Sequence, residues 1–421
     1  MSRMPVRTFL VKAKRHLQQV IHNRTSASFV IGNESADLDS ITCALVYGYI
    51  QSSTRQAQRN SDFIIPVVNI PAADLPLRPE LTSLLKHAGL EPKDLITLDD
   101  LQPLPLPLTN TRWTLVDHNA LTGLLGTHYS TTIISLIDHH EDEHIVPISA
   151  NPRILTIAGS CSSLVANFLR PTWEDLSSTS SVVGAANAQS SDGVIDDFAY
   201  TSGWDAQAAK LALGSILIDT FNLTDAHKTT DHDHKAVRYL EAKINASPQY
   251  GKDYDRDRFF NEINTAKSDL GALSIEDILR KDYKSWTEGG KKLGMSTVVR
   301  PLQYLLDKQA GGPFLQVLRD FSKKCDLDLL AVMTAYTSEE SGKFARELLL
   351  LVPDNDQNAS GSRAVAETFV ERFNEELALT EVRPQFDNGV ANAYWLRMWE
   401  QGNVSASRKQ VGPMLRRCMG G

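Results

Sequence analysis

The sequence predicts an α/β protein with an N-terminal domain built on a doubly wound parallel sheet and a smaller C-terminal α/β domain. Between residues 28 and 140, short apolar runs alternate with helical patterns, which is typical of a parallel sheet covered by helices on both faces. Clusters of Asp and His directly follow three of these runs, and open α/β sheets bind ligands at the carboxyl ends of their strands. Longer helices mixed with strands predict the second domain over 249–421, after a first domain over 1–248.

The first element expected is a helix over residues 8–21. Its apolar positions, Phe9, Leu10, Leu17 and Val20, would pack on the domain core. The first twenty residues carry five Lys and Arg residues and no acid, so a mitochondrial presequence is the alternative interpretation. We favour the helix because the segment is poor in Ser and runs directly into the first strand. The expected location is the cytoplasm, with an additional mitochondrial pool left open.

The remaining elements are predicted from apolar runs and capping residues. Candidate strands of the first domain lie at 28–32, 62–70, 113–117 and 132–138. Ser40 is a good N-cap for the helix that follows the first strand, and further helices are expected at 164–169, 205–218 and 235–244. The small, polar stretch 177–203 predicts a flexible insertion between helices. The second domain is expected to contain strands at 328–336 and 347–352.

The polar clusters contain the residue types that divalent cations prefer. The candidate metal ligands are acids and one imidazole: Asp37, Asp39, Asp117, His139 and Asp219, with Asn33 as a weaker candidate beside them. An acid at the C-terminus of a helix is disfavoured by the helix dipole, so a bound cation would explain Asp219. Asp and His together suit Mn²⁺ or Mg²⁺ better than a structural Zn²⁺, whose ligands normally include Cys.

Four carboxylates gathered in one place would repel one another unless cations neutralised them. Two divalent ions about 4 Å apart would do so and would form a clamp for in-line displacement at phosphorus. A water bridging the ions would lose a proton readily, and cationic side chains would hold the developing negative charge. His118 and His140 adjoin the expected ligands and could bond the substrate or relay protons.

Two further polar segments have a plainer interpretation. Gly159-Ser-Cys-Ser-Ser163 precedes an apolar helix; its amides and hydroxyls could hold an anion or support a ligand, and simple serine capping is the alternative. His232 and His234 resemble ligands, but they lie in a capping box formed by Thr230 and Asp233. We therefore leave these two histidines out of the site.

The motifs together resemble those of the DHH phosphoesterases. The matching segments of the first domain are Asn33-Glu-Ser-Ala-Asp37-Leu-Asp39-Ser, Asp117-His118-Asn119 and Asp138-His139-His140. Downstream, Asp282-Tyr283-Lys284 and Ser407-Arg408-Lys409 resemble the substrate motifs of the second domain that family II inorganic pyrophosphatases share with eukaryotic exopolyphosphatases. The resemblance spans nearly the whole chain.

This resemblance implies roles for individual residues. It implies that Asp37, Asp39, Asp117, His139 and Asp219 hold two Mn²⁺ or Mg²⁺ ions, in an active site in the cleft between the domains. It also implies that the phosphates are bound or attacked with the help of His118, His140, Lys284, Ser407, Arg408 and Lys409. The chemistry agrees, because Arg gives planar, bidentate phosphate contacts and Lys a mobile point charge.

One position indicates the branch of the family. Pyrophosphatases have His where this chain has Asn33, and the exopolyphosphatase branch resembles this chain in having Asn. The expected function is therefore the release of terminal phosphate from inorganic polyphosphate. The alternatives are a family II pyrophosphatase, a prune-like nucleotide phosphodiesterase and, less favoured, a non-catalytic phosphate-binding module. Arg300 and Arg346 are candidates for contacts with the rest of the polymer.

Composition limits the other partners. The net charge of −8 argues against a general nucleic-acid coat, and a nuclease would call for aromatic stacking platforms that the chain lacks. No apolar run reaches the roughly 18 residues of a membrane span. The four Cys residues form no CxxC pair and predict free thiols. By the resemblance to exopolyphosphatases, we expect a monomer.

Overall fold

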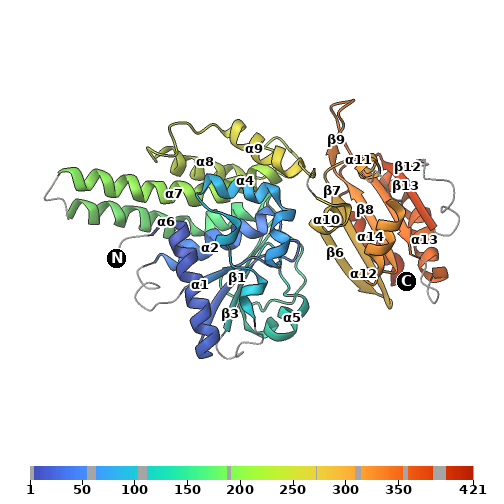
Figure 1. Ribbon diagram of the computed structural model, residues 1–421, viewed down its shortest axis with the longest axis horizontal. Helices are drawn as coiled ribbons and strands as arrows, with labels where there is room; N and C mark the ends of the chain where they lie inside the picture. Colours follow the sequence, from blue (N-terminus) through green and yellow to red (C-terminus); the bar gives the residue numbers. More distant parts are fainter. Residues whose placement is uncertain are drawn as a thin grey trace. The chain divides into compact units, whose positions relative to one another are not determined.

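The computed structural model describes residues 4–54, 63–102, 111–186, 191–271, 273–308, 314–353, 359–382 and 395–420, without the side chains of 179–201 and 359–360. The chain divides into two compact units, Met1–Lys267 and Ser268–Gly421 (Figure 1). We expected the boundary after residue 248. The units divide later because helix α9 (Arg256–Ser268) buries Phe259, Phe260 and Ile263 in the core of the first unit.

The first unit is built on a five-stranded parallel sheet in the order β2-β1-β3-β4-β5. The strands are β1 (Ala27–Ile31), β2 (Ile64–Val67), β3 (Thr111–Val116), β4 (Ile133–Asp138) and β5 (Arg153–Leu155). The four strands expected from the sequence are thus confirmed, and β5 is an addition. The chain order reverses between β1 and β3, so this sheet has a topological switch point there, where open α/β sheets bind their ligands.

Helices cover both faces of this sheet (Figure 1). They are α1 (Val6–Asn23), α2 (Leu38–Ser52), α4 (Pro79–His87), α5 (Gly123–Tyr129), α6 (Cys161–Ala186), α7 (Ser191–Asp219), α8 (Asp231–Asn245) and α9. Helix α1 buries the expected apolar positions, including Phe9, Leu10, Leu17 and Val20. Packing on the core therefore accounts for the apolar side of this basic segment.

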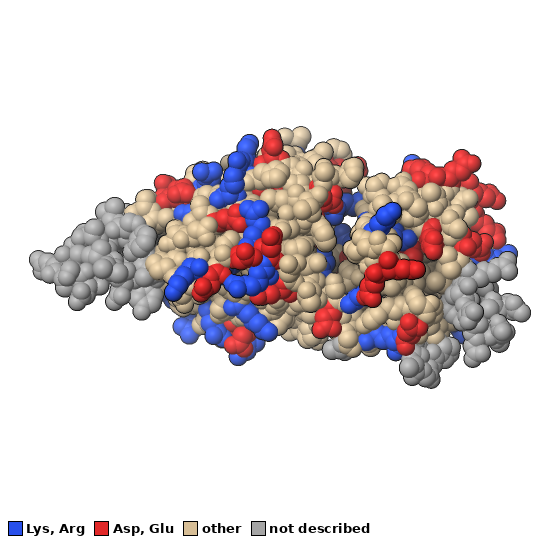
Figure 2. Space-filling model, turned by 90° about the horizontal axis from the view of Figure 1, so that it is seen from above, with Lys and Arg blue, Asp and Glu red and all other residues tan. Residues whose placement is uncertain are grey.

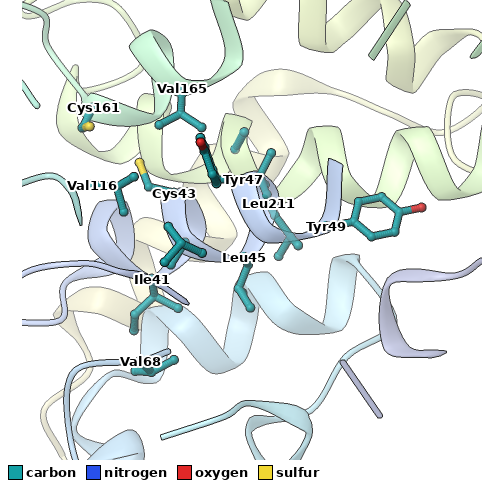
Figure 3. Packing of buried hydrophobic residues seen from close by; sticks show 14 of the residues in the cluster. Ile41, Cys43, Leu45, Tyr47, Tyr49, Val68, Val116, Cys161, Val165 and Leu211 are labelled. Atoms are coloured by element: carbon teal, nitrogen blue, oxygen red, sulfur yellow. The ribbon is translucent and has the colours of Figure 1, made fainter. Parts of the chain in front are cut away.

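Helix α2 is buried on almost every side, as its largely apolar sequence requires. It contacts β2, α6 and α7. Figure 3 shows Ile41, Cys43 and Tyr47 of α2 among residues of this core, with Val116 and Val165 close by. The loop between β1 and α2 contains Asp37 and leads directly into this helix. The burial of α2 therefore fixes one end of this loop.

The stretch 177–203, expected to be a flexible insertion, is mostly helical, so that expectation was wrong. Helix α6 continues to Ala186 and α7 begins at Ser191; residues 187–190 lie outside the described part. The two helices run alongside each other (Figure 1). Asp205 of α7 accepts bonds of 2.6 Å from Trp173 Nε1 and 2.8 Å from Ser177 Oγ of α6. Tertiary pairing of this kind overrides the weak helical signal of a Ser-rich sequence.

The second unit contains a mixed six-stranded sheet in the order β12-β13-β11-β8-β7-β6. Its strands are β6 (Tyr283–Glu288), β7 (Lys291–Val298), β8 (Leu329–Thr334), β11 (Glu347–Val352), β12 (Leu379–Val382) and β13 (Trp395–Gln401), and β9 (Tyr336–Thr337) pairs with β10 (Phe344–Ala345) apart from them. Only β7 and β8 are parallel neighbours. The strands expected at 328–336 and 347–352 correspond to β8 and β11.

Helices cover both faces of the second sheet as well. They are α10 (Ile275–Lys281), α11 (Leu302–Lys308), α12 (Phe314–Lys324), α13 (Ala359–Leu377) and α14 (Arg408–Met419). Residues of β8 alternate between two apolar clusters, with Leu329 and Met333 on one side and Leu330 and Val332 on the other. This alternation follows the pleat of a strand that is buried on both faces.

The surface carries many charged side chains. Within the described ranges, no helix has both the length and the apolar character needed to cross a bilayer. On the first unit, Lys and Arg side chains lie among Asp and Glu side chains on the face drawn in Figure 2. The four cysteines are free thiols, as expected.

Candidate active site

The loop after β1 begins with a turn that only glycine can make. A Cβ on Gly32 would lie 2.6 Å from the Cβ of Ser40, so the loop and the start of α2 approach too closely for any side chain. Asn33 N–H donates to Ser40 Oγ over 3.1 Å. The buried guanidinium of Arg78, from the start of α4, donates to the carbonyls of Ser35 and Ala36. These bonds hold the backbone that presents the first two acids.

The two acids of this loop face different surroundings. Asp37 is exposed and is the N-cap of α2, where its Oδ1 accepts from Ser40 N over 2.9 Å. Asp39 is buried against the N-terminus of α6. It accepts from Ser160 Oγ, Cys161 N and Ser162 N over 2.8, 2.6 and 2.8 Å. A helix N-terminus stabilises a carboxylate through its free amides and its dipole.

Asp117 lies at the end of β3, beside the first loop. Its backbone is in the left-handed region, with φ of 60°, a conformation that is uncommon outside glycine and concentrates at functional sites. Oδ2 accepts from Ser40 Oγ over 2.6 Å and from Asn33 Nδ2 over 2.8 Å, and Oδ1 lies 3.2 Å from His139 Nε2. Burial, followed by the charges of Asp37 and Asp39, raises the pKa of Asp117 to about 6.

The two histidines after β4 are oriented by different acceptors. Nδ1 of His139 lies 2.9 Å from the carbonyl of Ala158, so the proton is assigned to Nδ1. Nε2, on the side of Asp117, then carries a lone pair that can bind a cation. Nδ1 of His140 lies 2.8 Å from Asp138 Oδ1. Although burial alone raises the pKa of Asp138, its bonds with His140 and Asn119 keep that pKa well below the ordinary value. Asp138 is therefore an ionised partner for His140.

Asp219 ends α7 beside these groups. Its Oδ2 is buried and has no hydrogen-bond partner among the described residues. Burial, then the charges of Asp39 and Asp37, raise its pKa well above the usual value. A buried carboxylate without a donor is costly unless a cation compensates it, and that is the environment expected of a metal ligand.

A divalent cation fits this group of residues. One ligand atom from each of Asp117, His139 and His140 lies within 4.8 Å of the others. Asp37 and Asp39 are near enough to raise the pKa values of Asp117 and Asp219. Carboxylate oxygens with imidazole nitrogen form a donor set for Mn²⁺ or Mg²⁺. The residues predicted as ligands thus interact with one another in the first unit, and their role as ligands stays a prediction.

Asn33 and His118 support the cluster in other ways. The Asn33 amide nitrogen donates to Asp117 Oδ2, and its oxygen accepts from Ser35 N over 2.9 Å. In this arrangement Asn33 holds Asp117 in place. His118 Nδ1 lies 3.0 Å from the carbonyl of Val116, and its charge helps to lower the pKa of Asp138.

The substrate motifs predicted in the second unit are joined to each other. Arg408, at the start of α14, donates to Asp282 just before β6, with 2.7 Å to Oδ1 and 3.0 Å to the carbonyl. Ser407 caps α14 by accepting from Lys409 N over 3.3 Å. Lys284 follows on β6. Among the described residues, neither Lys284 nor Lys409 takes part in an ion pair, and their contact with phosphate stays a prediction.

Arg300 and Arg346 are tied to backbone carbonyls of the second unit. Arg300 Nε donates to Ser268 O over 3.1 Å, and its Nη1 lies 3.5 Å from the exposed carboxylate of Glu339. Arg346 Nε donates to Val404 O over 2.7 Å, in the segment that leads to Ser407. Burial lowers the pKa of Arg346. Arg346 therefore braces this segment, and both arginines are half-buried.

Sequence reasoning missed several residues that support the ligands. Arg78 has no local pattern that would connect it to the first motif. Asn119 donates to Asp138 Oδ2 over 2.7 Å and accepts from Glu143 N; its place within Asp117-His118-Asn119 was the available signal. The segment Gly159–Ser163 holds the carboxylate of Asp39 through three hydrogen bonds, and a metal-binding role of Asp39 stays a prediction.

Comparison with known proteins shows the family to which the chain belongs. The model of the DHH family, N-terminal domain, matches residues 28–190, and the DHHA2 domain model matches residues 261–418. A Schizosaccharomyces pombe protein named "Putative exopolyphosphatase" is 32% identical over 98% of this chain and 97% of its own length. Together, the two domain matches and this relative show that the chain belongs to the DHH family of phosphoesterases.

More distant relatives have related names. Human "Exopolyphosphatase PRUNE1" is 26% identical over 93% of this chain and 75% of its own length. The manganese-dependent inorganic pyrophosphatase of Methanothrix thermoacetophila is 23% identical over 74% of this chain and 82% of its own length. A crystal structure titled as a putative family II inorganic pyrophosphatase of Methanococcus jannaschii has a TM-score of 0.56 at 20% identity, covers 94% of this chain and all of that chain, and supports the fold.

Proposed function

We propose that this protein is a metal-dependent exopolyphosphatase, which releases the terminal phosphate of inorganic polyphosphate. The observation that carries the proposal is that Asp219 Oδ2 is buried without a hydrogen-bond donor among the described residues, near Asp39 and Asp37, while ligand atoms of Asp117, His139 and His140 lie within 4.8 Å of one another. Such a group requires cations. The names of the S. pombe and human relatives support polyphosphate as the substrate.

The proposed cofactor is a pair of Mn²⁺ or Mg²⁺ ions bound by Asp37, Asp39, Asp117, His139 and Asp219. Ions held there would lower the pKa of a water molecule and neutralise phosphate oxygens, which are the roles of paired ions in displacement at phosphorus. His140, held by Asp138 through Nδ1, can bond a phosphate oxygen or relay a proton through its other nitrogen. His118 assists by keeping Asp138 ionised.

The second unit carries cationic side chains that are suited to binding phosphate. Lys284 and Lys409 offer ammonium groups, and Ser407 presents Arg408 at the first turn of α14. The ion pair between Arg408 and Asp282 keeps the guanidinium in a defined orientation. Ordered guanidinium groups stabilise charge that develops on a transferred phosphate.

Inorganic pyrophosphate is the second candidate substrate. The M. thermoacetophila relative is named a manganese-dependent inorganic pyrophosphatase. Asn33, which donates to Asp117 in place of the His expected in pyrophosphatases, favours the polyphosphate branch. A prune-like phosphodiesterase would act on a nucleotide.

Phosphate release tests the proposal directly. The protein is assayed with tripolyphosphate, long-chain polyphosphate, pyrophosphate and a short oligonucleotide, in Mn²⁺, in Mg²⁺ and in EDTA. We expect metal-dependent release from polyphosphate and nearly complete loss in Asp117→Ala. The matched control is Asp175→Ala, which removes an exposed acid of α6 and should behave as wild type. Release from pyrophosphate alone, or full activity of folded Asp117→Ala, would contradict the proposal.

A further inference from the structure

The N-terminal turn of α6 lies between two buried carboxylates. Asp39 lies on one side, and three of its four hydrogen-bond donors come from this turn, the fourth being Cys43 Sγ of α2. Asp233, from the first turn of α8, lies on the other side and is fully buried. The two acids are far apart in sequence, and the turn 159–163 connects them through hydrogen bonds.

Asp233 accepts hydrogen bonds from both elements that it joins. From the α6 turn it accepts Gly159 N over 2.9 Å, Ser160 N over 3.2 Å and Ser163 Oγ over 2.6 Å. From its own capping box it accepts Thr230 N over 2.7 Å and Thr230 Oγ1 over 2.8 Å. A carboxylate has about four lone-pair positions, so these donors saturate Asp233 and leave it no freedom to reorient.

The same turn is closely packed against the end of α7. A Cβ on Gly159 would lie 2.6 Å from Thr220 Cγ2 and 2.9 Å from Asp233 Oδ2. Thr220 directly follows Asp219. The position of the turn is therefore fixed from two sides, by Asp233 and by Thr220, which follows the expected ligand Asp219.

We propose that Asp233 is a positioning residue for the metal site. By binding Gly159, Ser160 and Ser163, it fixes the amides and the hydroxyl that orient the carboxylate of Asp39. A capping box needs only the bond between Asp233 and Thr230, so the three bonds to the α6 turn are additional. The inference rests on the proposed function only in taking Asp39 as a ligand of a divalent ion.

The competing explanation is that Asp233 merely caps α8. Two substitutions separate the two roles. Asp233→Asn keeps the shape of the side chain but replaces one carboxylate oxygen with an NH₂ group. This NH₂ group would face the donors of the α6 turn or those of Thr230, which would then lose their acceptor. Thr230→Ala removes a hydroxyl of the same capping box and leaves the bonds to the α6 turn in place. If capping alone matters, both variants should behave alike.

The decisive measurement is the affinity of the metal-free, full-length protein for Mn²⁺ by isothermal titration calorimetry. We expect Asp233→Asn to raise the Kd for Mn²⁺ by about 10–100-fold, the range seen when groups that orient metal ligands are removed. Thr230→Ala should remain within about threefold of wild type. Hydrogen exchange of the amides at 159–163 should increase in Asp233→Asn and stay unchanged in Thr230→Ala.

Equal Kd values for wild type and folded Asp233→Asn would overturn the inference, as would an equal loss in Thr230→Ala. If Asp233→Asn does not fold, Ser163→Ala removes a single bond to Asp233 and should still raise the Kd severalfold; an unchanged Kd would then overturn the inference. The titration contains no phosphate substrate. A wild-type protein that binds Mn²⁺ but releases no phosphate from polyphosphate would contradict only the proposed function, whereas a wild type that binds no Mn²⁺ would overturn both.

Discussion

Asp117 combines features that are costly in a metal-free protein. Its backbone is left-handed and its side chain is buried. Burial, followed by the charges of two neighbouring acids, raises its pKa to about 6. A cation bound to the carboxylate would offset the cost of its burial and the repulsion from the neighbouring acids. Residues of this kind are expected at functional sites, where the rest of the fold holds them in place.

The first prediction is that the metal-free protein loses stability as the pH rises through about 6. The pKa of Asp117 is higher in the folded than in the unfolded state, so its protonation stabilises the fold at low pH, and this contribution is lost as the pH passes the folded pKa. In EDTA, the melting temperature should fall between pH 5 and pH 7.5, with a smaller fall in Asp117→Asn. Mn²⁺ should restore the wild-type value at pH 7.5 by binding the folded state. Identical pH dependence in both proteins would contradict the prediction.

The second prediction concerns Asn33. Replacing it with His should tighten the binding of Mn²⁺ or Co²⁺, because imidazole is a softer and stronger donor than an amide, and should move the substrate preference towards pyrophosphate. Calorimetry and phosphate release measure the two effects. Asn261→His is the matched control, since Asn261 is exposed on α9. If Asn33→His and wild type bind both ions equally, residue 33 neither contacts a metal nor orients a ligand.

At the level of elements, β6 and α14 of the second unit are joined by side-chain contacts. The pair between Arg408 and Asp282 links the first turn of α14 to the start of β6. Arg346 adds a bond to the segment before α14. The two motifs that the sequence separates by more than a hundred residues therefore form one cationic group, while Arg300 lies apart, beside Ser268 and Glu339.

The third prediction follows from this difference. Arg408→Ala should lower kcat on every phosphate substrate by about 10²–10³-fold, as when one transition-state donor is removed. Arg300→Ala should mainly raise KM for long polyphosphate, more strongly at low salt. Arg417→Ala, in the last turn of α14, is the control. The measurement is kcat and KM on tripolyphosphate and on long chains at two salt concentrations; a change confined to KM for long chains in Arg408→Ala would place that residue outside the reaction centre.

The structure gives Arg346 a structural role. The sequence makes this residue a candidate for contact with the rest of the polymer, but its guanidinium donates to Val404 O and Thr334 O. Removing it would leave carbonyls unpaired, at a cost of about 1–3 kcal/mol if they remain buried. The effect of Arg346→Ala on stability therefore has to be separated from any effect on KM.

For the molecule as a whole, we predict a monomer, on the strength of the exopolyphosphatase resemblance. Light scattering coupled to gel filtration should give 46.6 kDa, with and without Mn²⁺. Twice that mass would contradict the prediction. The net charge of −8 and the intermingled charges on the first unit favour solubility over association.

Much of the first sheet and most of the candidate ligands could be predicted because local patterns encode them. Apolar runs marked β1 to β4, and the acids after these runs had to meet at the carboxyl edge of a parallel sheet. The 177–203 stretch could not be predicted, because its helices depend on pairing such as that between Trp173 and Asp205. The boundary after Lys267 likewise depends on where Phe259 and Phe260 are buried.

The sequence by itself determined the residue types, their strand-end positions and hence the chemistry that Asp37, Asp117 and His139 can perform. Only the tertiary structure decided how the ligands are held. Arg78 on the first motif and Asp233 behind the α6 turn act on groups that are distant in sequence. A single side chain leaves no periodic signal, and its partner is chosen by packing and by the need to satisfy buried donors and acceptors. That need is met only once the chain has folded.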